Sequence, residues 1–375
     1  MTAIEIVLWS AAALVAYAYF GYPVLLLSWL PWRRRIVRRP GTTPAVSIVI
    51  TVHNGAGVMA AKIANTLALR YPADRMEILV ASDGSTDETN AVVRGLSDDR
   101  VRLVELPNRL GKEGAQREAI ARARGDILLF TDAGVQAASD AVENMVASFS
   151  DSSVGCVSGV DRVLDASGRA QGEGAFVRYE TRLKLLESEI GSTVGNSGWL
   201  FAVRRELCDE WPSDMASDFT MALRAVRRGL RCIVDPRVVA VATASASERR
   251  EFDRKVRTIA RGMVVLGAHR DLLNPLRYGR FAVQLLSHKL LRWCLPFLLA
   301  TLLVASAALA IGSIPYRALL AVQVAFYASG VVWPGARLPR FFVISSAATL
   351  VAWWKVVCGE RFVTWDPTPR TLGIE

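Results

Sequence analysis

Two aspartates stand directly after apolar runs that are typical of buried strands. The stretch GDILLFTDAGV places Asp132 just after Ile127–Phe130, and the stretch EILVASDGSTDET places Asp83 before a Gly-Ser turn. Open α/β sheets bind their ligands beyond the carboxyl ends of such strands. Asp132 is therefore placed to meet a ligand or, as Asp commonly does, to begin a turn. Asp83 could accept hydrogen bonds from a nucleobase or ribose, or simply lead into the caps of the next helix.

The elements that must position these aspartates alternate along the chain between residues 44 and 269. Apolar runs at residues 45–52, 76–82, 101–106 and 126–132 predict strands, and helical patterns lie around residues 59–69, from residue 86 and around residues 114–124. Repeated strand–helix order of this kind predicts an α/β fold with a parallel, doubly wound sheet.

The composition indicates contact with lipid and with anions. The chain has 375 residues, 52% of them hydrophobic, with a formal net charge of +10 and a mean hydropathy of +0.27. Such a charge suits anionic lipid, a phosphorylated substrate or nucleic acid. Nucleic acid is the weakest of these, because the strongest arginine run adjoins a membrane segment and no basic-aromatic platform accompanies it. The five cysteines form no metal-binding spacing, which favours a reduced, cytosolic setting.

Apolar segments near both ends predict membrane helices. Residues 4–32 carry no charge except Glu5, and the basic stretch RRRIVRR follows them. That order places the amino terminus outside and the central domain in the cytoplasm. Residues 275–293 predict an interfacial helix, and three apolar segments follow, of which the second is marginal. The side of the membrane that holds the carboxyl terminus stays open.

The resulting organisation has five parts. They are an N-terminal transmembrane helix (1–32), a basic linker (33–44), a cytosolic domain (45–269), an interfacial helix with two or three membrane helices (270–358) and a C-terminal tail (359–375).

Four motifs together resemble one known family. PAVSIVITVHN, EILVASDGSTDET, NRLGKEGAQREAIARARGDILLFTDAG and VGCVSG follow one another in this order. They are similar to the inverting family 2 glycosyltransferases, in the membrane-bound branch related to cellulose, chitin, hyaluronan and poly-N-acetylglucosamine synthases. The resemblance covers residues 45–267 and extends weakly to the tail RFVTWDPTPR.

The family implies a fold, a reaction and partners. The fold is the Rossmann-like GT-A nucleotide-sugar fold, flanked here by transmembrane helices. The reaction moves a sugar from a nucleoside-diphosphate donor, expected to be UDP-linked, to a polysaccharide or a lipid-linked glycan at the inner face of the cell membrane. A partner for export is also expected, and no nucleic acid.

The resemblance also implies roles for residues of the donor site. Asn54 would line the nucleotide pocket, Asp83 would bind the base and Lys112 would lie near the nucleotide. Asp132 matches the first aspartate of the family's Asp-x-Asp signature, and Gly134 stands where the second is expected. Either Asp132 holds Mg²⁺ or Mn²⁺ with phosphate and water, or basic residues neutralise the diphosphate instead.

Further residues would serve the reaction and its leaving group. By its place in the motif order Asp218 would be the general base, although a carboxylate in a first helical turn can also merely complement the helix dipole. Gly198 and Trp199 would lie on the acceptor side. Arg254, Arg257 and Arg261 share one helix face, where they could bind phosphate or anionic lipid.

Two other functions compete with this prediction. A polyprenyl-phosphate glycosyltransferase charges a lipid that is already anionic, so it needs no strong base. A membrane scaffold that has kept the fold but lost turnover is the other, and Gly134 is the best argument for it.

Overall fold

The computed structural model describes residues 1–39, 41, 43–164, 175–243, 248–333, 335–360 and 362. Two compact units divide the chain. Within the described residues, the helical unit comprises Met1–Ser28, Ser247–Val264 and Leu273–Glu360, and the sheet unit comprises Trp29–Ala246 and Val265–Leu272. The tail motif RFVTWDPTPR lies almost wholly outside the described residues.

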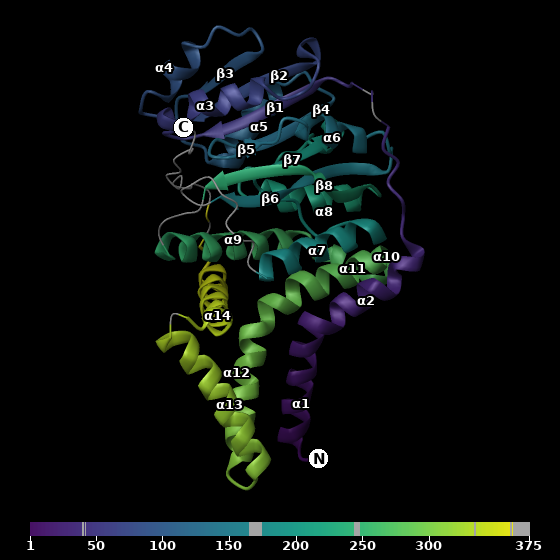
Figure 1. The fold of residues 1–375 in the computed structure, drawn as a ribbon, viewed down its shortest axis with the longest axis vertical. Helices are drawn as coiled ribbons and strands as arrows, with labels where there is room; N and C mark the ends of the chain where they lie inside the picture. The colour runs from purple at the N-terminus through teal and green to yellow at the C-terminus, as the bar shows by residue number, and fades with distance from the viewer. Residues whose placement is uncertain are drawn as a thin grey trace. The chain divides into compact units, whose positions relative to one another are not determined.

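The sheet unit is built on eight strands of the described chain, in the order β3-β2-β1-β4-β7-β6-β8-β5 (Figure 1). Their bounds are β1 Val46–Val52, β2 Met76–Asp83, β3 Val101–Leu106, β4 Ile127–Asp132, β5 Gln136–Ala137, β6 Val154–Leu164, β7 Leu200–Arg204 and β8 Arg231–Thr243. The four predicted strands are β1 to β4, and they pair in parallel as expected. Beyond β4 the sheet is mixed, because β7 runs antiparallel to both β4 and β6.

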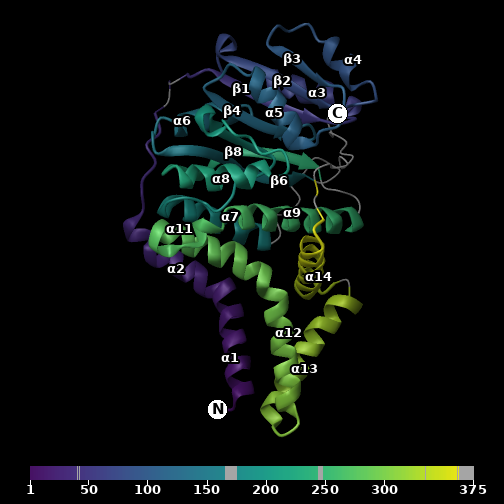
Figure 2. The same cartoon turned by 180° about the vertical axis from the view of Figure 1, so that it is seen from behind.

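Helices cover both faces of this sheet, which confirms the predicted α/β fold. They are α3 Ala56–Leu67, α4 Thr89–Arg94, α5 Lys112–Arg122, α6 Ala141–Ser148, α7 Ala175–Ile190 and α8 Ser217–Arg227. One apolar cluster joins α3 and α6 to one face of β1, and the second joins α5 and α8 to the other face. All seven residues of β1 are buried because both of its faces are covered. Figure 2 shows the same strands and helices from behind.

The helical unit contains the apolar segments. Its helices are α1 Ala3–Ala16, α2 Tyr22–Trp29, α10 Pro275–Tyr278, α11 Arg280–Leu285, α12 Leu291–Ala310, α13 Ile314–Val332 and α14 Arg337–Val357, and α9 Glu248–Ala268 passes from this unit into the other. Three stretches of the described chain are long and apolar enough to cross a membrane, namely Ala3–Trp32, Arg280–Ala310 and Arg337–Val357.

Two details differ from the expected membrane segments. The helix α13, predicted as a marginal crossing, is not among the three candidate spans. The segment expected to lie in the interface continues through a π-helical turn at Leu286–Leu290 into α12, so that Arg280–Ala310 forms one long helical run. The division of residues 270–358 between interface and membrane stays a prediction.

Candidate active site

Asp83 lies at the carboxyl end of β2 and is fully buried. Its Oδ1 accepts a hydrogen bond from the backbone N–H of Leu110 at 2.6 Å, and its Oδ2 accepts one from Gly111 at 3.0 Å. Hydrogen bonds to a carboxylate are among the stronger ones in proteins. Asp83 thereby holds the segment that leads into α5, whose first residue is Lys112. Its contact with a nucleobase stays a prediction.

Asn54 follows β1 and holds the turn after Asp83. Its φ of +50° lies in the left-handed region, which asparagine tolerates better than most residues. Its side-chain Oδ1 accepts a hydrogen bond from the Thr86 N–H at 2.8 Å, and its own N–H donates to Ser85 Oγ at 3.1 Å. The ends of β1 and β2 are therefore held together, and the role of Asn54 in a nucleotide pocket stays a prediction.

Lys112 and Asp132 form an ion pair at the centre of the site. Lys112 Nζ lies 2.5 Å from Asp132 Oδ1 and 3.4 Å from the carbonyl oxygen of Gly198. Burial lowers the pKa of Lys112, but the charges of Asp132, Glu113 and Asp218 outweigh it and hold the pKa above its ordinary value. The site therefore contains a permanent positive charge at neutral pH. The Asp132 side chain is 35% exposed, which leaves the pair open to a ligand.

Asp218 lies beside Gly198, in the first turn of α8. Its Oδ1 accepts a hydrogen bond from the Phe219 N–H at 2.9 Å. A β-carbon on Gly198 would come within 2.9 Å of Asp218 Oδ2, so a residue without a side chain permits this approach. The structure thus brings Lys112, Asp132 and Asp218 together around one glycine.

Two residues that hold the start of α8 in place were not identified from the sequence. Glu113 is 2% exposed, and its Oε1 accepts a hydrogen bond from the Ser217 N–H at 3.4 Å, which joins the start of α5 to the start of α8. Asn196 donates from Nδ2 to the carbonyl oxygen of Asp218 at 3.0 Å. Glu113 lies inside a quoted motif and Asn196 lies just before Gly198, but the partners of both residues are distant in sequence, so no local signal indicated these contacts.

Trp199 lies next to Asp132 through the backbone. The Asp132 N–H donates to the Trp199 carbonyl oxygen at 3.4 Å, and the Trp199 N–H donates to Ser197 Oγ at 3.1 Å. Ser197 Oγ in turn lies 2.6 and 2.7 Å from the two carboxylate oxygens of Asp161. This half-buried polar group adjoins the ion pair, and the assignment of Gly198 and Trp199 to the acceptor stays a prediction.

The three arginines proposed for the diphosphate lie on α9, as their spacing predicted. Arg254 donates from Nε and Nη2 to the Glu251 carboxylate at 2.9 and 2.6 Å. Arg254, Arg257 and Arg261 belong to the part of α9 that lies in the helical unit. Their contact with a diphosphate stays a prediction.

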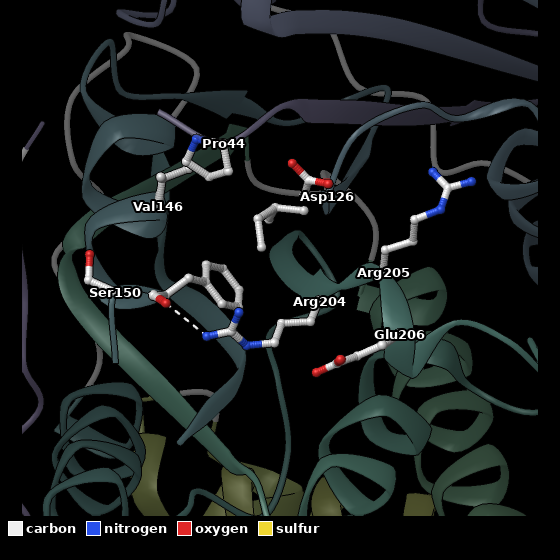
Figure 3. Close-up of a pocket in the computed structure, with 9 residues that line it drawn as sticks. Pro44, Asp126, Val146, Ser150, Arg204, Arg205 and Glu206 are labelled. Atoms are coloured by element: carbon white, nitrogen blue, oxygen red, sulfur yellow. Dashed lines mark hydrogen bonds between the residues drawn. The ribbon is translucent and has the colours of Figure 1, made fainter. Parts of the chain in front are cut away.

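A cavity of about 470 Å³ lies at the other end of the strands (Figure 3). Asp126 just before β4 lines it, as do Arg204 and Arg205 at the end of β7. Arg204 donates to backbone carbonyl oxygens that include those of Phe149 and Val154, at 2.8 and 2.7 Å, and Arg205 donates to two further carbonyl groups. Because both guanidinium groups already bind the backbone, we favour the Lys112–Asp132 pair as the reaction centre.

Comparison with known proteins defines the class. Residues 47–211 match the family model described as glycosyl transferase family 2. The structure resembles that of the mannosyltransferase PcManGT from Pyrobaculum calidifontis, solved with GDP-Man and Mn²⁺, with a TM-score of 0.75 and 28% sequence identity over 95% of this chain and 99% of that one. The fold is thus of the GT-A glycosyltransferase type. Residues 47–211 of the chain therefore resemble a glycosyl transferase family 2 domain.

Curated relatives include a lipid glucosyltransferase and a further glycosyltransferase. The beta-monoglucosyldiacylglycerol synthase of Nostoc sp. is 25% identical over 210 residues, which are 53% of this chain and 45% of that protein. The glycosyltransferase AglD of Haloferax volcanii is 29% identical over 214 residues, which are 52% of this chain and 33% of that protein. The chain therefore spans less than half the length of either relative.

The residues around Asp132 fit a divalent cation only with help from a substrate. Among the described residues, no cluster of three or more His, Cys, Asp or Glu side chains is arranged to hold a metal. Mg²⁺ and Mn²⁺ take oxygen ligands, and Mg²⁺ is commonly held by one or two carboxylates together with phosphates and water. Asp132 offers one carboxylate of this kind, whose Oδ1 already accepts a hydrogen bond from Lys112.

Replacing Gly198 by alanine tests how closely Asp218 must approach it. The new methyl group would displace the Asp218 carboxylate, and a misplacement of about 1 Å can cost roughly 100-fold in rate. We expect kcat to fall about 10- to 100-fold in Gly198→Ala, with an unchanged melting temperature. Gly57→Ala on α3 is the control, because a β-carbon there meets nothing within 4 Å. Equal activity of the two variants would contradict the described geometry.

Proposed function

We propose that the protein is a membrane-bound, inverting glycosyltransferase. It moves a sugar from a nucleoside-diphosphate sugar, expected to be UDP-linked, to a polysaccharide or lipid-linked glycan. The observation that carries the proposal is the meeting of a lysine–aspartate pair with a second carboxylate, Asp218, at the ends of the strands. Ligands of open α/β sheets bind at this edge.

The reaction needs one base and one site for the leaving group. The acceptor hydroxyl gives its proton to the Asp218 carboxylate as its oxygen attacks the anomeric carbon from the side opposite the diphosphate. The bond between that carbon and the diphosphate oxygen breaks, and the nucleoside diphosphate leaves with the electron pair. A positioned base of this kind supplies roughly 10²- to 10⁴-fold in rate. One displacement inverts the configuration at the anomeric carbon.

Lys112 stabilises the leaving group in this scheme. Its ammonium is held by the ion pair with Asp132 and lies near Gly198. It therefore needs little rearrangement as negative charge develops on the diphosphate. Asp132 would hold a divalent cation, which supplies further charge neutralisation to the diphosphate when bound. The arginines of α9 are proposed to add to this neutralisation.

The membrane setting and the acceptor follow from the flanking helices and the relatives. The basic stretch after the first candidate span favours a cytoplasmic catalytic domain in a multi-pass protein of the cell membrane. Similarity to a diacylglycerol glucosyltransferase supports an acceptor that is itself in the membrane. With few membrane helices, the chain is expected to use a separate export partner if its product is a polysaccharide.

A panel of labelled donors tests the function. Membranes containing the full chain are incubated with UDP-glucose, UDP-N-acetylglucosamine and GDP-mannose, and both nucleotide release and product size are measured with and without EDTA. We expect one donor to label a glycan or glycolipid, and EDTA to lower the rate at least tenfold. If no donor releases nucleotide at any Mn²⁺ concentration, the proposal is wrong and the protein is a scaffold.

The size of the product distinguishes the proposed function from a second candidate function. A polyprenyl-phosphate glycosyltransferase adds one sugar to an anionic lipid, and the similarity to a glycolipid synthase favours keeping this possibility in the test. Its product would be a single labelled lipid of low mass, and loss of the Asp218 carboxylate would then have a mild effect.

A further inference from the structure

Lys62 is a charged residue in the core of the sheet unit. It lies on the inner face of α3 and is 1% exposed, among the apolar residues Met59 and Ile63. Its Nζ donates to Thr131 Oγ1 at 3.0 Å and to the carbonyl oxygen of Val135 at 2.5 Å. The four motifs quoted for the family do not include this residue, and the proposed chemistry does not use it.

The two partners of Lys62 bracket the turn that carries Asp132. Within that turn the Val135 N–H donates to the carbonyl oxygen of Asp132 at 3.2 Å. Lys62 therefore binds the residue before Asp132 and the residue that closes the turn. Asn65, one helical turn further along α3, binds both the N–H and the carbonyl group of Ala137 at 3.0 and 3.1 Å. Lys62 and Asn65, on one face of α3, thus hold the chain by hydrogen bonds on both sides of Gly134.

Burying this amine is costly, which argues against a purely stabilising role. Burial lowers the pKa of Lys62 to about 7, although the Asp132 carboxylate acts in the opposite direction. An apolar residue of similar shape is often as stable at such a position, or more so. The amine can donate both hydrogen bonds whether or not it is protonated.

Water is poorly placed to substitute for the amine. The free volume beside Lys62, bounded also by Thr66 and Leu200, is about 10 Å³. A single water molecule needs at least about that much space, together with two to four polar partners. Without the amine, the Val135 carbonyl oxygen would therefore lack a hydrogen-bond donor, and the turn could shift.

We propose that Lys62 is a positioning residue, which fixes the turn from Asp132 to Val135 so that Asp132 meets Lys112. This inference rests on the proposed function, because the orientation of Asp132 matters through the donor diphosphate. Gly134 adds no side chain to the turn, and the hydrogen bonds from α3 hold the chain on both sides of this glycine. Lys62 touches no reacting atom in this scheme and acts only through Asp132.

The test compares Lys62→Met with Thr66→Val in the full chain in detergent. Methionine is an unbranched side chain one atom shorter than lysine, and it makes none of the hydrogen bonds of the amine. Thr66 lies on the same helix and is equally buried, but its hydroxyl donates within the helix, to the Lys62 carbonyl oxygen at 2.8 Å. Three quantities are measured: deuterium exchange of residues 127–137, the melting temperature, and kcat and KM for the donor.

We expect Lys62→Met to speed exchange in residues 127–137 and to lower kcat/KM for the donor at least tenfold, with acceptor KM unchanged. Its melting temperature should stay within about 4 °C of the parent, because the lost hydrogen bonds are offset by removal of a buried charge. Thr66→Val should leave exchange and kinetics unchanged.

Each alternative result has a distinct meaning. Unchanged deuterium exchange in Lys62→Met would show that Lys62 does not hold the turn. Faster exchange with unchanged kcat/KM would show that holding the turn does not matter for the reaction. A lower melting temperature with normal kinetics per folded molecule would make Lys62 a stabilising residue and overturn the proposal. Absence of transfer in the parent protein with every donor would refute the proposed function instead, and exchange would still decide whether Lys62 holds the turn.

Discussion

Asp218→Asn is expected to abolish sugar transfer and to leave donor binding intact. Asparagine keeps the shape of the side chain beside Gly198 but cannot take a proton from the acceptor, so kcat should fall by roughly 10²- to 10⁴-fold. Donor affinity should change less than about threefold, because in the proposed mechanism Asp218 faces the acceptor. Transfer rate and the dissociation constant for the donor, measured on the same preparation, check both parts.

Asp214→Asn is the matched control for this variant. Asp214 lies four residues before Asp218, is also half-buried, and is assigned no role in the mechanism. It should keep at least half of the parent activity. Full turnover in Asp218→Asn would show that another group takes the proton or, if the product is one labelled lipid, that the acceptor is already anionic.

Lys112→Met is expected to have the second largest effect. It removes the ammonium that contacts Asp132 and Gly198, and with it the charged hydrogen bond that the proposed mechanism assigns to the diphosphate. Hydrogen bonds to charged groups contribute about 1.5–3 kcal/mol, which corresponds to roughly 10- to 150-fold in kcat/KM for the donor. Steady-state kinetics with the donor varied at saturating acceptor measure this loss.

The variant also separates two sources of charge neutralisation. If Asp132 holds a cation, removal of Lys112 frees Oδ1, so the Mn²⁺ concentration needed for half-maximal rate should fall in Lys112→Met. Lys184→Met on α7 is the control for the loss of a lysine elsewhere in the sheet unit. Unchanged donor kinetics in Lys112→Met would show that the diphosphate lies away from this pair.

The sequence predicts the strands that carry the site, because each of β1, β2 and β4 is a short apolar run that ends at a polar residue or, for β1, just before one. It does not predict how the sheet continues. The strand β7 is short, follows a glycine-rich turn and pairs antiparallel with β4, and no periodic signal specifies its direction. Gly198 and Trp199, which are predicted to lie on the acceptor side, depend on that pairing for their place.

The sequence predicts those site residues that lie in a recognisable motif. It does not predict those whose role depends on contacts with residues far away in the sequence. Asp132, Lys112 and Asp218 were found from their motifs, and the structure brings them together. Glu113 hydrogen-bonds to a residue 104 positions away in the sequence, and Lys62 hydrogen-bonds to residues 69 and 73 positions away. A lysine on the apolar face of a predicted helix was visible in the sequence, but its partner was not.

Asp83 shows a further limit of reasoning from motifs. The resemblance assigns it to the nucleobase, and the structure shows it holding Leu110 and Gly111 just before Lys112. A buried carboxylate can serve a site by fixing the backbone that presents another residue. Its substitution should therefore disturb Lys112 as well as any bound base.

The most direct test is a structure of the full chain with a nucleoside diphosphate and Mn²⁺. The account predicts the diphosphate within 3.5 Å of Lys112 Nζ, on the side of Asp132 that faces Asp218. Density for the diphosphate in the cavity lined by Arg204 and Arg205 instead, with the Lys112–Asp132 pair unchanged, would contradict it.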